Sequence, residues 1–476
     1  MDTPTNNSKN TYNNKEIPQI EHQKYRKVSI SDGNSEDNNE EIDSRYCLKK
    51  PFAKIEQGSL IECIFNLSIF SLGVGLLTLP RKVHYISLFL TPLLIIIGGV
   101  VNYWTLTILG DASRKYGLTK YEDAVTLLFN QNLSYFFSFV MCLNQFGIII
   151  ELQIIVYKFL GAVVNQFFSY GYKDMENFAS RSFWGKKKIK IIVCYLITYI
   201  VLFPLCLIKT ISKMRYSSLI GVTCLFLMIL ILLIQFPSFY YHNIHQRKND
   251  INFLDLKYGF DKNMEFFQSI STIIYAFECH VGLFPVLSCL QKPTKIRVQK
   301  VLRNAVLIDA VSCMIIALSG YLSQPFNTPE LIVERHTIFK HDFLMMTGLI
   351  FFICTLVTKI GANYNGFRST ILNLFKYDIN NYPNCINFLI TFLTLFVTTF
   401  IAAYFKKNIA NYMDLSATFC SIIVVIIMPG MIYIKGNDYP IYHAKNLFMI
   451  IFMLVVSSIG LCTIVCTLQK LFPINW

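Results

Sequence analysis

The chain has 476 residues, of which 54% are hydrophobic and only 15% are charged, and its formal net charge is +14. The apolar residues stand in blocks long enough to cross a bilayer, which excludes a soluble protein, and the basic residues lie in short loops between these blocks, which favours a membrane topology signal over a nucleic-acid partner. The 14 cysteines lie mostly inside apolar blocks and form no Cys-x-x-Cys pair, so we expect neither disulfides nor a metal site, and no cofactor.

The N-terminal segment differs in composition from the rest of the chain. Residues 1–57 are rich in Asn, Ser, Asp, Glu and Lys and hold few large apolar side chains. Such a segment cannot bury enough surface to fold, so we predict a disordered cytoplasmic tail. Residues 58–476 are predicted to form one transmembrane domain.

The apolar blocks that follow predict an all-α membrane protein with about eleven transmembrane helices. The loop from Lys292 to Arg303 carries the densest basic cluster, and the positive-inside rule places it in the cytoplasm together with the N-terminus. Residues 117–129 are expected to form a short amphipathic helix on the same side. The predicted spans are roughly 58–82, 86–110, 133–163, 188–208, 217–237, 265–290, 304–323, 343–366, 384–404, 409–434 and 445–471.

The first span contains an unusual run of small and helix-breaking residues between Asn66 and Pro80. Ser71, Gly73 and Gly75 precede Pro80 within a few positions. Glycine and proline weaken a helix, and irregular backbone at membrane depth persists only where protein or a polar cavity satisfies it. The pattern favours a broken helix that exposes backbone groups to a substrate, and the alternative is a continuous span whose small residues pack against neighbours.

The sixth span is interrupted in a similar way between Tyr275 and Pro285. It carries Glu278, His280 and Gly282 at membrane depth, where ionisable groups are costly and point to function. Paired interruptions in spans one and six hold corresponding positions in two five-span halves, as in transporters built from inverted repeats. We therefore predict unwinding near Leu72–Gly75 and near Glu278–Gly282.

Three stretches together resemble the amino acid/auxin permease family. They are Asn66–Pro80, the segment Phe203–Gly221 with its Pro-Leu, Lys and Met-Arg-Tyr-Ser-Ser elements, and Ala276–Pro285 with its Phe-x-Cys-His-x-x-x-x-Pro pattern. The resemblance implies a LeuT-like 5+5 inverted repeat with an extra C-terminal helix. It also implies that residues 58–476 form a transporter domain for amino acids, driven by protons or by sodium.

The resemblance places the substrate between the two interruptions, flanked by spans three and eight. The first interruption would offer backbone N–H groups to the substrate carboxylate, at the positive end of a half-helix. The second would offer backbone carbonyl groups to the substrate ammonium group. The residues carried over are Ser71, Leu72, Gly73, Val74 and Gly75 for the carboxylate, and Ala276, Phe277, Glu278 and Cys279 for the ammonium group.

The chain departs from the family pattern at the positions that resemble sodium ligands, which are Ile69 and Lys359 here. Isoleucine cannot bind a hard cation and lysine would repel one, so sodium-independent transport is expected, either proton-coupled or facilitative. Lys359 is therefore a candidate coupling residue whose ammonium group fills a cation site, and the alternative is that its side chain extends to the membrane surface. Glu151 is a second coupling candidate, either protonated, paired or lining the cavity.

Two acidic groups in one site would favour a cationic amino acid such as Lys or Arg, so Glu278 and Glu151 are both candidate substrate contacts. His280 is expected to make a fixed hydrogen bond beside the helix break. Asp309, about two turns into span seven, is expected to pair with Arg303 or another cation at the inner rim.

Three other functional classes stay open at this stage: a channel or receptor, a carrier of other small organic cations, and an intramembrane enzyme. The sequence shows no nucleophile–base pair, no His-Glu-x-x-His and no phosphate-binding loop, which disfavours the enzyme. The apolar spans imply that the lipid bilayer is a partner of the protein. Their sequences are compatible both with the plasma membrane and with the membrane of an acidic organelle.

Overall fold

The structure is a computed structural model in which all the described residues belong to the unit Lys54–Trp476. It describes residues 56–168, 187–245, 264–325, 328–334, 342–375, 377, 382–404, 418–437 and 439–471. The tail predicted for residues 1–57 lies outside the described residues, apart from its last two positions.

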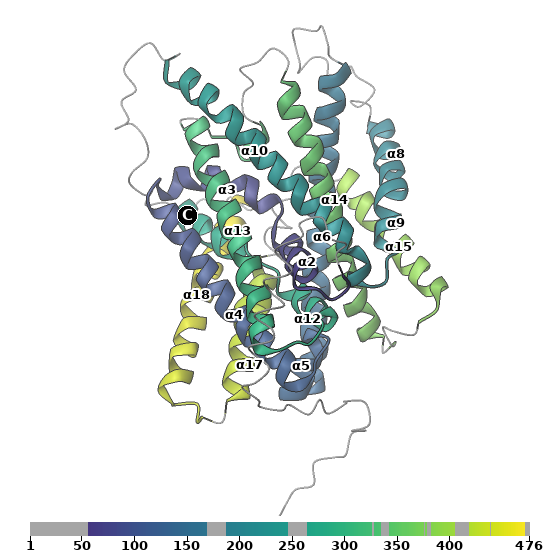
Figure 1. Cartoon of the computed structure of the whole chain (residues 1–476), viewed down its shortest axis with the longest axis vertical. Coiled ribbons are helices and arrows are strands. Elements are labelled where there is room, and N and C mark those ends of the chain that lie inside the picture. Colours follow the sequence, from purple (N-terminus) through teal and green to yellow (C-terminus); the bar gives the residue numbers. More distant parts are fainter. Residues whose placement is uncertain are drawn as a thin grey trace, which may run out of the picture. The chain divides into compact units, whose positions relative to one another are not determined.

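Every regular element in the described part of the chain is a helix (Figure 1). Short 3-10 and π segments adjoin several of the α-helices. The α-helices are α2 (Leu60–Ser71), α3 (Val74–Ile86), α4 (Leu90–Tyr116), α5 (Tyr121–Leu128), α6 (Gln131–Phe168), α8 (Lys187–Ile197), α9 (Phe203–Cys206), α10 (Arg215–His245), α11 (Met264–Tyr275), α12 (His280–Cys289), α13 (Lys295–Ser323), α14 (Phe343–Leu374), α15 (Asn384–Tyr404), α17 (Met428–Gly436) and α18 (Ala444–Leu471). The other segments are η3 (Thr198–Leu202), η4 (Ile211–Met214), η6 (Ile332–Glu334) and η7 (Ile422–Ile427).

Length and composition make this a multi-pass membrane protein. Within the described residues, 9 helices are long and apolar enough to cross a membrane, and a bent pair raises the number to 10. Each of the predicted spans overlaps a helix. The fourth predicted span corresponds only to a shorter apolar helix, Ile191–Cys206, so the expected number of eleven is not established by length.

The first predicted interruption is present between α2 and α3. Helix α2 ends at Ser71, Leu72 and Gly73 are extended, and α3 begins at Val74. The two half-helices are bent by 55° relative to each other. The first N–H groups of α3 therefore start without an intrahelical partner, as at every helix N-terminus.

The second interruption lies slightly earlier than predicted. Helix α11 ends at Tyr275 and α12 begins at His280, so the irregular residues are Ala276–Cys279. Gly282, expected to be unwound, is helical, and its N–H donates to the Cys279 carbonyl at 3.1 Å. Its physical role is close packing, because a Cβ at Gly282 would collide with the ring of Phe70 on α2.

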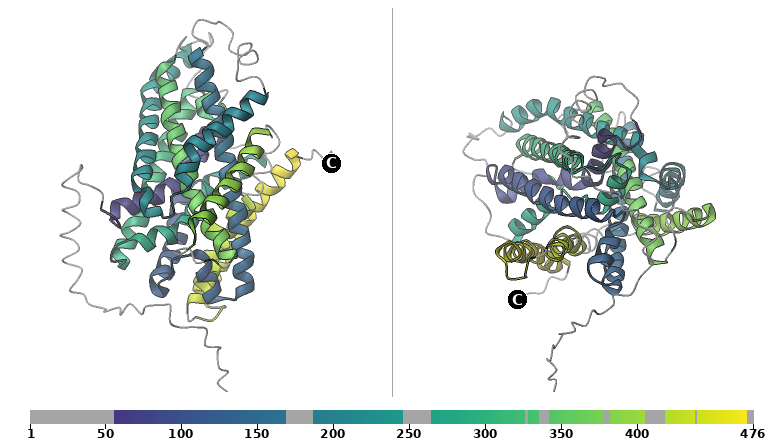
Figure 2. Two further views of the ribbon diagram at one scale, coloured as in Figure 1. Left: turned by 90° about the vertical axis from the view of Figure 1, so that its right-hand side faces the viewer. Right: turned by 60° about the horizontal axis from the view of Figure 1, so that its bottom comes forward.

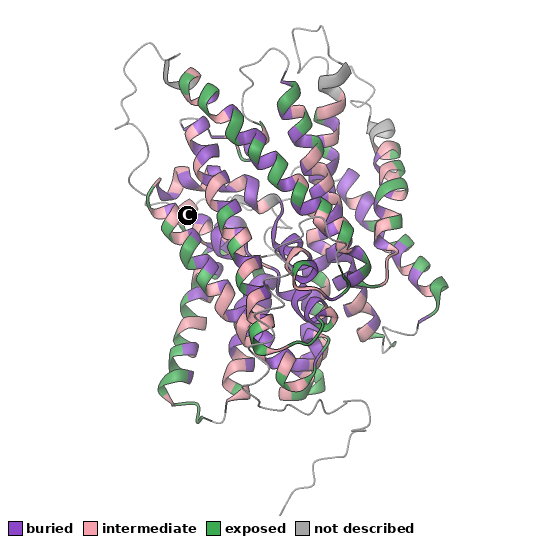
Figure 3. Ribbon diagram, viewed as in Figure 1, coloured by how far each residue is buried: buried purple, intermediate pink, exposed green. Residues whose placement is uncertain are grey.

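Helix α18 lies at the edge of the bundle (Figure 2), whereas α2, which leads into the first interruption, packs against several helices. Helix α2 packs against α10, α12, α13 and α14, and α6 packs against α14. Only 22% of the most apolar window of α18 is buried, and Figure 3 shows exposed residues along its length. The helices around α2 thus enclose the first interruption, and most of the α18 surface is left uncovered by the other described helices.

Candidate functional site

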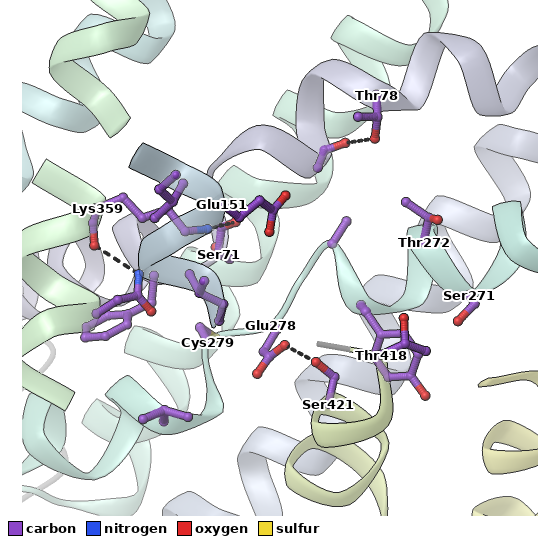
Figure 4. Close-up of a pocket in the computed structure, with 18 of the residues that line it drawn as sticks. Ser71, Thr78, Glu151, Ser271, Thr272, Glu278, Cys279, Lys359, Thr418 and Ser421 are labelled. Atoms are coloured by element: carbon purple, nitrogen blue, oxygen red, sulfur yellow. Dashed lines mark hydrogen bonds between the residues drawn. The ribbon is translucent and has the colours of Figure 1, made fainter. Parts of the chain in front are cut away.

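A cavity of about 260 Å³ lies beside both interruptions (Figure 4). Its walls come from the two broken spans and from α6, α14, α18 and the segment that leads into η7. The lining side chains are mostly polar. They are Phe70, Ser71, Gly75, Thr78, Lys82, Gln145, Ile148, Glu151, Leu152, Gln268, Ser271, Thr272, Tyr275, Ala276, Glu278, Cys279, Val281, Lys359, Asn363, Thr418, Ser421, Thr463 and Thr467.

Most of the predicted site residues line this cavity, and some do not. Those that do are Ser71, Gly75, Glu151, Ala276, Glu278, Cys279 and Lys359. The side chain of Phe277 is instead fully buried against α4, where a Cβ on Gly98 would lie 3.3 Å from its ring. Leu72 is buried outside the lining, Gly73 lies beside Lys359, and the side chain of Val74 lies outside the described residues.

Lys359 occupies the end of the first half-helix. Its Nζ donates a hydrogen bond to the Ser71 carbonyl at 2.9 Å. Ser71 is the last residue of α2, and the C-terminal end of a helix carries a partial negative charge that favours a cation. The ammonium group is therefore directed at the interruption, and the alternative that it extends to the membrane surface is wrong.

Asp309 joins this arrangement from α13. The Ser71 hydroxyl donates to Asp309 Oδ2 and also contacts the Ser68 carbonyl at 3.0 Å. The expectation that Asp309 pairs with Arg303 at the rim is thus wrong. The position of a residue along a helix predicts its depth in the membrane but not the direction in which its side chain points. The orientation of α13 about its own axis turns this carboxyl group toward α2.

Glu278 is held at the cavity wall by two donors from distant helices. Its Oε1 accepts from Asn144 Nδ2 at 2.7 Å, and its Oε2 accepts from the Ser421 hydroxyl (Figure 4). Asn144 and Ser421 are not among the residues predicted from the sequence. Each is a buried polar residue within an apolar span, and that is the signal that could have identified them.

Two cations line the cavity, Lys82 and Lys359. The carboxyl groups of Glu151, Glu278 and Asp309 all interact electrostatically with Lys359. In a medium of low polarity such interactions are stronger than in water. The arrangement can therefore hold a charged, zwitterionic solute more readily than an apolar one.

His280 has the structural role that was expected. Its Nε2 lies 2.9 Å from the Thr105 hydroxyl of α4, and the residue is fully buried. It begins α12 and is absent from the cavity lining. The hydrogen bond therefore holds the start of the second half-helix against α4.

The bundle is closed on the side of α5. Tyr121 stacks on Phe284 at 5.2 Å between ring centroids and meets Phe137 edge-on at 4.8 Å, and its hydroxyl donates to the Val424 carbonyl at 3.0 Å. The cavity lining extends the other way, to Lys82 on α3. Figure 1 places α3 and α5 at different levels of the bundle, so the cavity extends away from the α5 side.

No group of three or more His, Cys, Asp or Glu residues within the described ranges is arranged to hold a metal ion.

Comparison with known proteins identifies a family for most of the chain. The family model described as "Transmembrane amino acid transporter protein" matches residues 56–472. This is a family of transporters and not of enzymes, so the enzyme alternative is set aside.

Curated relatives are similar at low identity. "Vacuolar amino acid transporter 4" of Saccharomyces cerevisiae is 23% identical over 78% of this chain and 52% of its own length. "Putative amino acid transporter AAT1" of Toxoplasma gondii is 24% identical over 58% of this chain and 35% of its own length. "Putative sodium-coupled neutral amino acid transporter 11" of Homo sapiens is 22% identical over 38% of this chain and 43% of its own length. The matched part of the chain thus spans between 35% and 52% of the length of these relatives.

Proposed function

The chain belongs to the transmembrane amino acid transporter family, and we propose that it is a secondary carrier that moves amino acids through the cavity between its two interrupted spans. The observation that carries this proposal is the position of the cavity, which adjoins both interruptions. Irregular backbone lining a cavity within a membrane bundle is the arrangement by which such carriers bind solutes.

The fold that we propose is the LeuT-like 5+5 inverted repeat with an added last helix. The interruptions in the first and sixth spans support it, because they hold corresponding positions in two halves of five spans. The peripheral α18 supports it as well, since an added helix has no counterpart in either half.

The substrate carboxylate binds, in this proposal, at the N-terminus of α3. Gly75 lies in the first turn of that helix and faces the cavity, and the free N–H groups there favour an anion. The substrate ammonium group binds at the carbonyl groups of Ala276–Cys279. The two interruptions thus recognise the two charged groups common to all amino acids.

We propose a cationic amino acid as the preferred substrate. Glu278 and Glu151 both line the cavity, and Lys359, which lines it as well, donates its hydrogen bond to the Ser71 carbonyl. A cationic side chain would meet two carboxyl groups there, and the hydroxyl groups of Thr418 and Ser421 would complete its hydrogen bonds.

We propose that transport is independent of sodium, and either proton-driven or facilitative. One relative carries "sodium-coupled" in its name, but Ile69 here is a fully buried apolar side chain and Lys359 supplies a fixed positive charge. The membrane is the plasma membrane or an acidic organelle, and the name of the yeast relative is compatible with the second.

Counterflow in proteoliposomes tests the function. Vesicles loaded with unlabelled lysine should take up labelled lysine faster than empty vesicles, with saturation, and replacing sodium by choline should leave the rate unchanged. A channel would show no acceleration by internal substrate.

Competition by other solutes tests the substrate class. Neutral amino acids that compete far better than Lys or Arg would contradict the cationic preference. Uptake of choline or a simple diamine in place of every amino acid would favour a carrier of other organic cations.

A further inference from the structure

Asp309 is a buried acid that the proposed binding site does not use. It lies within α13, is only 1% exposed and is absent from the cavity lining. Its Oδ2 accepts the hydrogen bond from the Ser71 hydroxyl, while its Oδ1 is buried and has no hydrogen-bond partner among the described residues. A buried carboxyl oxygen without a donor is costly as part of an anion, and this favours the protonated form of the group.

Ser71 connects this acid to the cavity and to Lys359. Its hydroxyl contacts Asp309, its carbonyl accepts from Lys359 Nζ at 2.9 Å, and it lines the cavity. One residue at the end of α2 is therefore bound on one side by a carboxyl group and on the other by an ammonium group. A change in the charge of either group acts directly on the first interruption.

The charged and titratable groups around Asp309 are few. From α14 it meets Lys359, from the second interruption Cys279, and from its own helix Cys313. From α2 it meets the hydroxyl groups of Ser71 and Ser68. Among the described residues of α3, α4 and α10, no ionised side chain acts on it. Among the described residues, Lys359 is thus the cation that acts on Asp309.

We propose that Asp309 is the proton-binding residue of the transport cycle and that the Ser71 hydroxyl conducts the proton between it and the cavity. This inference rests on the proposed function and adds the residue that couples it to protons. A hydronium ion in the cavity gives a proton to the Ser71 oxygen, whose own proton passes to Oδ2 of the Asp309 carboxylate. The step leaves a neutral water molecule, a neutral serine and a protonated acid. The reverse transfer releases the proton once the site opens to the other side.

Protonation changes what holds the end of α2. The carboxylate accepts a charge-assisted hydrogen bond and attracts the ammonium group of Lys359, and the neutral acid does neither as strongly. The restraint on Ser71 from the α13 side weakens, while Lys359 stays bound to its carbonyl. The proton thereby loosens the half-helix whose end forms the first interruption, and this couples proton binding to movement of the site.

Two transport assays on Asp309→Asn separate coupling from binding. Asparagine has nearly the same size and can still accept from Ser71. The variant is expected to retain counterflow of labelled lysine, which requires no net proton movement, and to lose accumulation driven by a pH gradient. Asp111→Asn is the control, because it removes a carboxyl group from another helix, α4. This variant is expected to retain both activities.

The outcomes are decisive in each direction. Wild-type accumulation by Asp309→Asn overturns the proposal. If that variant loses counterflow as well, Asp309→Glu decides: restored accumulation supports a required acid, and no restoration assigns Asp309 a structural role and overturns it. Wild-type protein that shows counterflow but no response to a pH gradient overturns this inference alone, whereas absence of counterflow in the wild type overturns the proposed function.

Discussion

Gly75 is the residue at which the first interruption meets open space. A Cβ placed there would find only the Ala276 methyl group, 4.0 Å away across the cavity. A side chain can therefore be added without disturbing the protein core, and it would occupy the space proposed for the substrate carboxylate.

Gly75→Leu is thus expected to reduce uptake to background while expression and thermal stability stay close to wild type. The measurement is lysine counterflow, with the melting temperature of the purified protein beside it. Gly436→Leu is the matched control, because a Cβ at Gly436 meets no atom within 4 Å and the residue lies at the end of α17, away from the cavity lining. Near-normal uptake by the Gly75 variant would remove the carboxylate site from this position.

Lys359 supplies a positive charge at the end of α2. Lys359→Ala leaves the Ser71 carbonyl without this donor and leaves Asp309 without its cation. We expect the response of uptake to pH to disappear, because the pair proposed to respond to protons no longer exists. We also expect uptake to fall at least about tenfold, which corresponds to roughly 1.4 kcal/mol of lost interaction.

Sodium should not rescue the alanine variant, since Ile69 still offers no ligand oxygen. Uptake is measured across a pH series in sodium and in choline. A variant that keeps the wild-type pH profile would leave Lys359 with a structural role only and direct attention to Glu151.

At the scale of helices, α5 joins elements that are far apart in the chain. The Glu122 side chain accepts from the Thr370 hydroxyl of α14 at 2.8 Å, and its carbonyl accepts from Ser134 of α6 at 3.1 Å. Together with the contacts of Tyr121 to α12 and η7, these bonds hold the closed side of the bundle. Helix α5 thus acts as a brace across four other elements.

Burial raises the pKa of Glu122 above 4.5, although hydrogen bonds from its own backbone and from Thr370 oppose this effect. The folded protein therefore binds this proton more tightly than the unfolded chain does. The contribution of Glu122 to stability is fully present below the unfolded pKa and is lost as the pH rises from there through the folded pKa.

Glu122→Gln keeps an acceptor for Thr370 but cannot ionise. Its melting temperature is expected to fall less than that of the wild type as the pH rises from 4.5 toward neutrality. Thermal unfolding at a series of pH values measures the difference, with Asp111→Asn as the charge-removing control. If the melting temperatures of the wild type and of Glu122→Gln change with pH by the same amount, ionisation of this residue does not affect stability.

The interruptions could be predicted from the sequence because their signals are local. Glycine, proline and ionisable residues at membrane depth stand within a few positions of Gly73 and Glu278. The partners that complete the site could not be predicted, because they are distant in the sequence. Asn144 and Ser421 lie 134 and 143 residues from Glu278, and Asp309 lies 238 residues from Ser71. Hydropathy predicts how deep in the membrane each residue of a helix lies. The packing of the whole bundle determines which helices are neighbours and how each helix is rotated about its axis.

At the scale of the whole membrane domain, we infer from the contacts of Tyr121 and from the cavity lining that the site is closed toward α5 and opens in the other direction. Carriers of this kind alternate between openings on the two sides of one central site. The aromatic contact of Tyr121 with Phe284 and Phe137 belongs to the closed side. The cavity lining on α3 and α11 belongs to the open side.

Labelling by a thiol reagent tests on which side the cavity opens. Gln268 lines the cavity on α11, whereas Ser134 is 3% exposed and lies under α5, with its hydroxyl bonded to Glu122. Gln268→Cys is expected to react with a membrane-impermeant reagent added on the face opposite α5, and saturating lysine should slow that reaction because substrate fills the cavity. Ser134→Cys should stay unreactive in the same state, with the unmodified chain giving the background from native cysteines. Faster labelling of Ser134→Cys than of Gln268→Cys would mean that the protein rests open on the α5 side, and the closure formed by Tyr121 would then not hold in the membrane.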